Sequence, residues 1–91
     1  MEKIKEVIWG ASFRRAFKKF SKKDPNFAIY FREFFEDFCN NPNNSRFGLH
    51  KLKGRLSPCL SVKIKYDLRL IFKVEKKQII LVDIGTHDKV Y

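Results

Sequence analysis

The spacing of the apolar residues changes partway along this chain, and that change constrains the fold more than any other feature. In residues 11–40, apolar side chains recur at intervals of three and four, as they do on one face of an α-helix. From Leu49 onward the period changes to two, as on one face of a β-strand, and the alternation is clearest from Leu60. Helices followed by a sheet predict an α+β fold in which the helices pack on one face of the sheet.

The first part of the chain predicts a strand and a helical hairpin. Lys3–Trp9 is a short β-rich segment that we expect to form an N-terminal strand. Ser12 is the expected N-cap of the first helix, whose apolar stripe contains Phe13, Ala16, Phe17 and Phe20. Asp24 and Pro25 suit the N-cap and first position of a second helix, which ends at Asn40-Asn41-Pro42. Its apolar stripe contains Phe27, Tyr30, Phe31, Phe34, Phe35 and Phe38.

The second part predicts an antiparallel β-meander. Residues 60–67 and 68–75 alternate between apolar and polar, and residues 79–84 are apolar except for Asp83, as expected of a strand buried on both faces. The apolar residues of the first two strands face one another only if their loop has an odd number of residues. A three-residue loop, 65–67, places Lys63 opposite Arg69. Gly85 is expected to end the last strand. The sheet face without helices would then carry Lys63, Arg69 and Lys73, and we expect the functional site there.

The charge of the chain is large and unevenly distributed. The net charge is +10, and residues 11–23 contain six basic residues and no acidic one. Residues 49–73 contain seven basic residues and one aspartate. A field of this sign and size attracts polyanions such as RNA, DNA or an acidic protein.

Length and cysteine usage favour one domain, residues 1–91, in a reducing compartment. Cys39 and Cys59 lack a CxxC spacing, so neither a disulfide framework nor a zinc knuckle is expected. No apolar run approaches the roughly 18 residues of a membrane span, and the N-terminus does not resemble a signal peptide. We therefore expect a soluble, cytoplasmic protein without a membrane partner.

Histidine and arginine are the residues to examine for chemistry on a phosphodiester. RNA can be cut without a metal because its own 2′-OH is the nucleophile, so an enzyme needs a base, an acid and cations around the phosphorane. The two histidines, His50 and His87, lie outside the apolar stripes. Each alone could be an ordinary surface residue, and Arg69 could merely pair with Glu75 or Asp67. A zinc site of His50, Asp67, His87 and Cys59 would match no known ligand spacing.

Three segments together resemble a known family. Leu49–Gly54, Asp67–Phe72 and Asp83–Tyr91 are similar to the corresponding segments of the RelE/ParE superfamily of toxins, and most of all to its RelE/YafQ branch. The resemblance extends over nearly the whole chain in element order. It implies the toxin of a type II toxin–antitoxin system: a metal-independent, ribosome-dependent mRNA endoribonuclease that needs no cofactor. It also implies a cognate antitoxin, mRNA on the ribosome as substrate, and operator DNA as a ligand of the toxin–antitoxin complex.

The resemblance assigns roles to individual residues. His50 and His87 correspond to acid/base residues, Asp67 to a base or a residue that orients one, and Arg69 to the arginine that stabilises the phosphorane. Tyr91 corresponds to an aromatic residue that positions the substrate. Phosphate contacts are expected from Lys51, Lys53, Arg55, Lys63, Lys65 and Lys73. Some YafQ-like proteins have a histidine in place of Lys63, and a lysine is a poor general base at neutral pH. The base is then His50 or Asp67.

Two other functions fit the same sequence. A non-enzymatic poison of DNA gyrase, as in the ParE branch, shares the fold. A nucleic-acid-binding module that has lost its catalytic activity would share the basic surface. The histidines and Asp67 favour the nuclease, because a protein that only binds has no need of proton-transfer groups.

Overall fold

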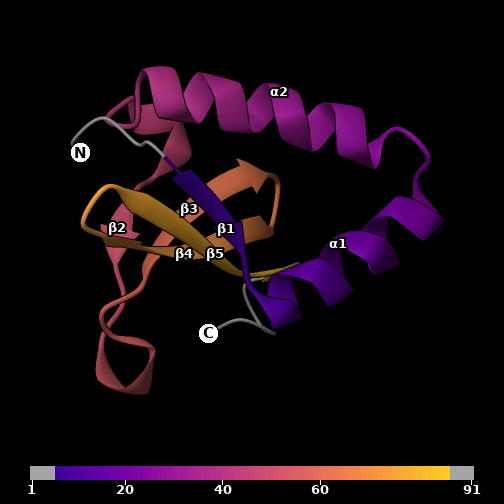
Figure 1. The fold of residues 1–91 in the computed structure, drawn as a ribbon. Helices are drawn as coiled ribbons and strands as arrows, with labels where there is room; N and C mark the ends of the chain where they lie inside the picture. The colour runs from indigo at the N-terminus through magenta and orange to yellow at the C-terminus, as the bar shows by residue number, and fades with distance from the viewer. Residues whose placement is uncertain (1–5, 87–91) are drawn as a thin grey trace.

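The computed structural model describes residues 6–86. Two α-helices follow the first strand, and four further strands follow the helices (Figure 1). The strands are β1 (Glu6–Trp9), β2 (His50–Lys51), β3 (Leu60–Lys65), β4 (Leu68–Glu75) and β5 (Gln78–Thr86). The helices are α1 (Ala11–Lys23) and α2 (Phe27–Asn40), with short 3-10 turns η1 (Ser45–Phe47) and η2 (Gly54–Leu56) on either side of β2.

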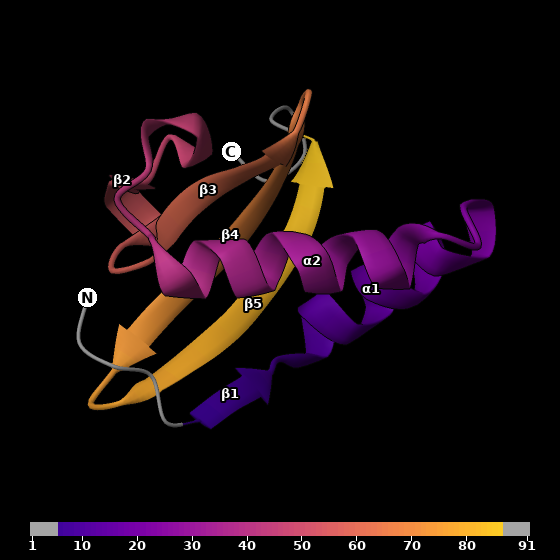
Figure 2. The ribbon, with the colours of Figure 1, turned by 90° about the horizontal axis from the view of Figure 1, so that it is seen from above.

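The strands form one sheet in the order β1-β5-β4-β3-β2. Neighbours from β2 to β5 are antiparallel, whereas β1 is parallel to β5, a pairing that the sequence did not predict. Both helices lie on the same side of the sheet, and α2 crosses over the strands when the molecule is viewed from above (Figure 2). The predicted α+β fold, with a helical hairpin on one face of a mainly antiparallel sheet, is therefore confirmed.

The core lies between the hairpin and the sheet and is built largely from phenylalanine. The rings of Phe38 on α2 and Phe72 on β4 meet edge to face, with their centroids 5.4 Å apart. Both side chains are fully buried, and burial of such a side chain stabilises the fold by roughly 1.5–3 kcal/mol. Neither α1 nor α2, the helices of the part described, is long and apolar enough to cross a membrane.

The first helix begins at Ala11, and the prediction that Ser12 is its N-cap is wrong. Gly10 occupies that position, since its carbonyl accepts a hydrogen bond from the Arg14 N–H at 2.9 Å, and its own N–H donates to the Leu81 carbonyl of β5 at 2.9 Å. A Cβ atom on residue 10 would lie only 2.8 Å from the same carbonyl oxygen, so the approach of the backbone requires glycine. Ser12 is inside the helix, where its hydroxyl accepts a hydrogen bond from Arg15 at 3.1 Å.

The second helix begins two residues later than the sequence predicts. The Asp24 carboxylate accepts a hydrogen bond from the Asn26 N–H at 2.9 Å, and the Asp24 carbonyl accepts one from the Phe27 N–H at 3.0 Å. These bonds form a turn that precedes the helix, so Asn26 rather than Asp24 is the N-cap. The helix ends at Asn40, as predicted.

Two strand ends also differ from the prediction. Gly85 does not end β5, because Gly85 pairs with Arg69 and Thr86 pairs with Leu68. Lys63 does pair with Arg69, as predicted, but an irregularity after Lys63 brings Lys65 opposite Leu68. The turn is consequently shorter than the three-residue loop expected. The predicted N-terminal strand is confirmed over Glu6–Trp9, and the rest of Lys3–Trp9 lies outside the described residues.

Candidate active face of the sheet

The face of the sheet opposite the helices carries the residues expected to do chemistry. Val62, Leu70 and Leu81 point into the core below the helices, so their neighbours along each strand point to the other side. We call this other side the active face; it carries Ser61, Lys63, Arg69, Ile71, Lys73 and Asp83, with His50 at its edge. Ser61 and Ile71 are buried even though they lie outside the core cluster.

His50 is held by the turn that precedes it. Gly48 has a left-handed conformation with φ of 55°, and its carbonyl oxygen lies 2.9 Å from Nδ1 of His50. A carbonyl oxygen only accepts hydrogen bonds, so Nδ1 carries the proton when the ring is neutral. The proton is then absent from Nε2, which is the state that a general base requires.

A row of side chains crosses the active face from β2 to β5. His50 pairs with Ser61, Ser61 with Ile71, and Ile71 with Asp83. The carboxylate of Asp83 accepts a hydrogen bond from the Ile84 N–H at 2.9 Å. This places a half-buried carboxylate on the same face as the imidazole.

Sequence reasoning missed Asp83 because β5 is irregular. Strict alternation would place residue 83 on the same side as Ile79 and Leu81, which are in the core. The register between β4 and β5 shifts after Ile71, and Ile84 rather than Asp83 then returns to the core. A bulge of this kind exchanges the faces of all later residues, and no residue in this segment signals it.

Lys63 and Arg69 form a pair of cations next to this row. They are direct cross-strand partners on β3 and β4, and Arg69 in turn pairs with Gly85 of β5. Glycine has no side chain to fill the place beside Arg69. At a strand separation of about 4.8 Å and a rise of about 3.3 Å per residue, the Cα atoms of His50 and Arg69 are roughly 12 Å apart.

Arg69 is not neutralised by the acids that the sequence offered as partners. Its guanidinium donates to the Tyr66 carbonyl at 3.3 Å, while Glu75 pairs with Lys73 at 3.3 Å. Asp67 lies exposed in the turn between β3 and β4, and it forms no ion pair within residues 6–86. The alternative in which Arg69 merely pairs with Asp67 or Glu75 therefore has no support in this part of the chain.

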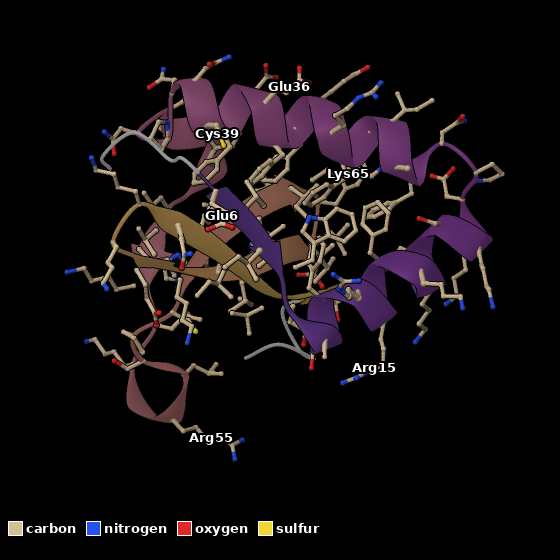
Figure 3. All side chains as sticks on the ribbon, in the orientation of Figure 1. Glu6, Arg15, Glu36, Cys39, Arg55 and Lys65 are labelled. Carbon is tan, nitrogen blue, oxygen red and sulfur yellow. The ribbon has the colours of Figure 1, made fainter. Side chains whose placement is uncertain are left out.

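The other cations expected to contact phosphate are dispersed. Lys73 is on the active face. Lys51 pairs with Leu60, which packs against the core, so Lys51 lies on the helix side of β2. The Lys65 ammonium lies over the Tyr30 ring, 4.2 Å from its centroid, and the side chain is directed toward α2 (Figure 3). Lys53 and Arg55 belong to the segment between β2 and β3, which extends away from the sheet on the side opposite α2, with Arg55 at its end (Figure 3).

Two expected site residues, His87 and Tyr91, lie outside the described residues. Within residues 6–86, no three side chains of His, Cys, Asp or Glu come together in a way that could hold a metal ion. Both cysteines are free thiols, and burial raises the pKa of the Cys39 thiol. The described part of the active face thus offers one imidazole, one carboxylate and three cations.

Solved structures with the same fold include several toxins. A copper-bound mutant toxin from Helicobacter pylori is 23% identical and has a TM-score of 0.78, over 94% of this chain and 98% of that one. YafQ from E. coli strain BL21(DE3) is 17% identical with a TM-score of 0.76, over 93% and 96% of the two chains. The chain from the E. coli DinJ-YafQ toxin-antitoxin complex is 16% identical with a TM-score of 0.74, over 98% of each chain. At these identities the likeness establishes the fold.

The family follows from the sequence itself. No curated protein matches the chain significantly. The sequence model of the YafQ toxin, described as a bacterial toxin of type II toxin-antitoxin system, matches residues 5–91. This match includes every element of the fold and all the residues of the active face. The chain therefore belongs to the YafQ family of bacterial toxins of type II toxin–antitoxin systems.

Proposed function

We propose that this toxin is an mRNA endoribonuclease in which the 2′-OH of the substrate attacks the adjacent phosphorus. A bond forms between the 2′-oxygen and phosphorus, and the bond between phosphorus and the 5′-oxygen breaks. A base removes the proton of the 2′-OH, and an acid supplies a proton to the leaving 5′-oxygen. The observation that carries this proposal is the position of His50, whose Nδ1 lies 2.9 Å from the Gly48 carbonyl oxygen, on the same sheet face as the Lys63–Arg69 pair.

The roles follow from the chemistry of each group. His50 is our first choice for the base, with Asp67 as the alternative. Arg69 and Lys63 would stabilise the extra negative charge of the phosphorane, since donors preorganised around developing charge contribute most to such reactions. His87 as the second proton-transfer group and Tyr91 as a residue that positions the substrate rest on the family resemblance alone. We propose that Lys51 and Lys65, on the helix side of the sheet, and Lys53 and Arg55, in the segment between β2 and β3, contact phosphates only along flanking RNA.

The proposed partners are the ribosome and an antitoxin. The described part of the active face holds few proton-transfer groups, so a ribosome that aligns the mRNA for in-line attack would supply what the toxin lacks. The relative in the E. coli DinJ-YafQ complex binds an antitoxin, and we propose that this toxin binds one too. The antitoxin complex would recognise operator DNA. The cytoplasm, where mRNA is translated, is the proposed location.

Primer extension on a defined mRNA tests the proposal. The mRNA is translated in an extract with purified toxin, with the Arg69→Gln variant, or with a Lys77→Gln control that removes one charge from the β4–β5 turn. We expect new 5′ ends with the toxin and the control, and few with Arg69→Gln. Intact mRNA in all reactions would contradict the proposal. DNA breaks formed in the presence of gyrase, together with intact mRNA, would instead assign the gyrase-poison function.

A further inference from the structure

One face of α1 is a continuous cationic stripe. Its five members are all exposed and line one surface hollow of about 420 Å³: Arg15, Lys18, Lys19, Lys22 and Lys23. Arg15 is labelled in Figure 3. The spacing of three or four residues places them along one side of the helix, over a length of about 12 Å at a rise of about 1.5 Å per residue.

No acidic side chain of residues 6–86 forms an ion pair with this α1 stripe. The ion pairs in that part of the chain join Arg46 to Asp37 and Lys73 to Glu75, and neither involves α1. Residues four apart on a helix are neighbours, so Arg15 and Lys19, and likewise Lys18 and Lys22, repel one another. This repulsion lowers the stability of the free protein, and a bound polyanion relieves it.

The composition of the stripe fits a nucleic acid better than a protein. Four of its five members are lysines, and the stripe itself contains no apolar side chain. Protein–protein interfaces are depleted in lysine and contain an apolar centre, whereas interfaces with nucleic acids are polar and strongly positive. The phosphodiester backbone is the matching ligand.

The stripe continues toward the active face. Lys19 and Lys23 line a second hollow, of about 280 Å³, together with Asp83, Gly85 and Thr86 at the end of β5. The two lysines outnumber the one carboxylate in this hollow. Gly85 is the cross-strand partner of Arg69. A nucleic-acid strand that leaves the neighbourhood of Arg69 past Gly85 therefore meets the α1 stripe next.

We infer that the α1 stripe binds the phosphodiester backbone of RNA that flanks the nucleotide at the active face. The location of the cleaved nucleotide rests on the proposed function, but binding by the stripe is measurable without cleavage. The stripe would increase the affinity for RNA without taking part in bond breaking, since it is separated from Arg69 by the end of β5.

Binding is measured with a fluorescent 2′-O-methyl RNA, which lacks the attacking hydroxyl and so stays intact. The proteins are the full-length toxin, a Lys18→Gln/Lys22→Gln variant and a Lys76→Gln/Lys77→Gln control. The control removes the same charge from the exposed β4–β5 turn. Each is titrated over a range of NaCl concentrations, and a DNA duplex of equal length serves as a second probe.

We expect the α1 variant to bind RNA more weakly and with a smaller salt dependence. Loss of two phosphate contacts lowers the slope of log K against log salt by about 1.4, which is roughly 25-fold in affinity at 0.1 M salt. The control should lose only a small part of the RNA affinity and of its salt dependence. In the translation extract, the α1 variant should raise KM and leave kcat unchanged.

The outcomes separate the two proposals. Equal slopes for the α1 variant and the control would overturn the inference, even if the toxin cleaves mRNA. Stronger binding of the duplex DNA than of the RNA would overturn the assignment to RNA. A selective loss of RNA binding by the α1 variant, with no mRNA cleavage by the unaltered toxin, would uphold the inference and contradict the proposed function.

Discussion

Lys63 and Arg69 lie directly opposite each other on the active face, as partners in the antiparallel pairing of β3 with β4. Like charges in this position destabilise a sheet. No carboxylate of residues 6–86 forms an ion pair with either side chain. The pair therefore reduces the stability of the free protein and favours the binding of an anion at that place.

Replacing Arg69 by Gln should have opposite effects on stability and activity. Removal of the repulsion should stabilise the fold by about 0.2–1 kcal/mol. Loss of the cation should lower kcat for mRNA cleavage by about 10²–10³-fold, the usual effect of removing one group that stabilises developing charge. Urea denaturation and single-turnover cleavage measure the two quantities. A variant that is less stable and fully active would show that Arg69 has a structural role.

Replacing His50 by Gln should identify the base. If Nε2 of His50 takes the proton of the 2′-OH, kcat should fall by roughly 10²–10⁴-fold with little change in KM. Asp67→Asn, measured in parallel, should have a smaller effect. A larger loss in the Asp67 variant would transfer the role of the base to that carboxylate.

Gly10→Ala tests the close approach between the start of α1 and β5. The added Cβ would lie 2.8 Å from the Leu81 carbonyl oxygen, and backbone must move to admit it. We expect a loss of about 1–3 kcal/mol in the free energy of unfolding, as is typical of overpacking. Gly54→Asn is the control, because nothing lies within 4 Å of a Cβ at residue 54 and asparagine tolerates its positive φ. Thermal unfolding that is unchanged by Gly10→Ala would show that the contact is easily relaxed.

Tyr30 should make the stability depend on pH in the alkaline range. Its hydroxyl donates to the Ile64 carbonyl at 3.4 Å, and burial raises the pKa of the phenol above the ordinary 10.0. Since the folded state has the higher pKa, the contribution is fully present below about pH 10 and is lost as the pH rises through the raised value. Tyr30→Phe should remove this part of the pH dependence while costing about 0.5–1.5 kcal/mol at pH 8. Denaturation curves at pH 8 and pH 11 measure both effects.

The fold was predictable because its apolar pattern is strong and local. The phenylalanine stripe of α2 and the alternation in β3 and β4 each determine which face is buried. The pairing of Lys63 with Arg69 followed from that alternation together with a turn centred on residue 66. The helix starts were not predictable in the same way. The N-cap at Gly10 depends on a contact with Leu81, which is 71 positions further along the chain.

The site was predictable only where alternation holds. Arg69 and Lys73 share the active face because β4 alternates regularly, with Leu70 and Phe72 in the core. The extra residue at the register shift lies in the neighbouring strand β5. Asp83 was missed because the register shift between β4 and β5 reverses the faces of the residues that follow. Lys65 was expected to contact phosphate, but its ammonium lies over Tyr30 because a second irregularity, in β3, brings it to the helix side.

If the substrate's own 2′-OH is the nucleophile, a single 2′-deoxy substitution at the cleavage site removes the attacking group. The cleavage site is first mapped on an mRNA in the translation extract, and the ribose on the 5′ side of the broken phosphodiester is then replaced by deoxyribose. We expect cleavage at that position to disappear while the unsubstituted mRNA is cut. Equal cleavage of both mRNAs would contradict it, because the nucleophile would then have to come from elsewhere.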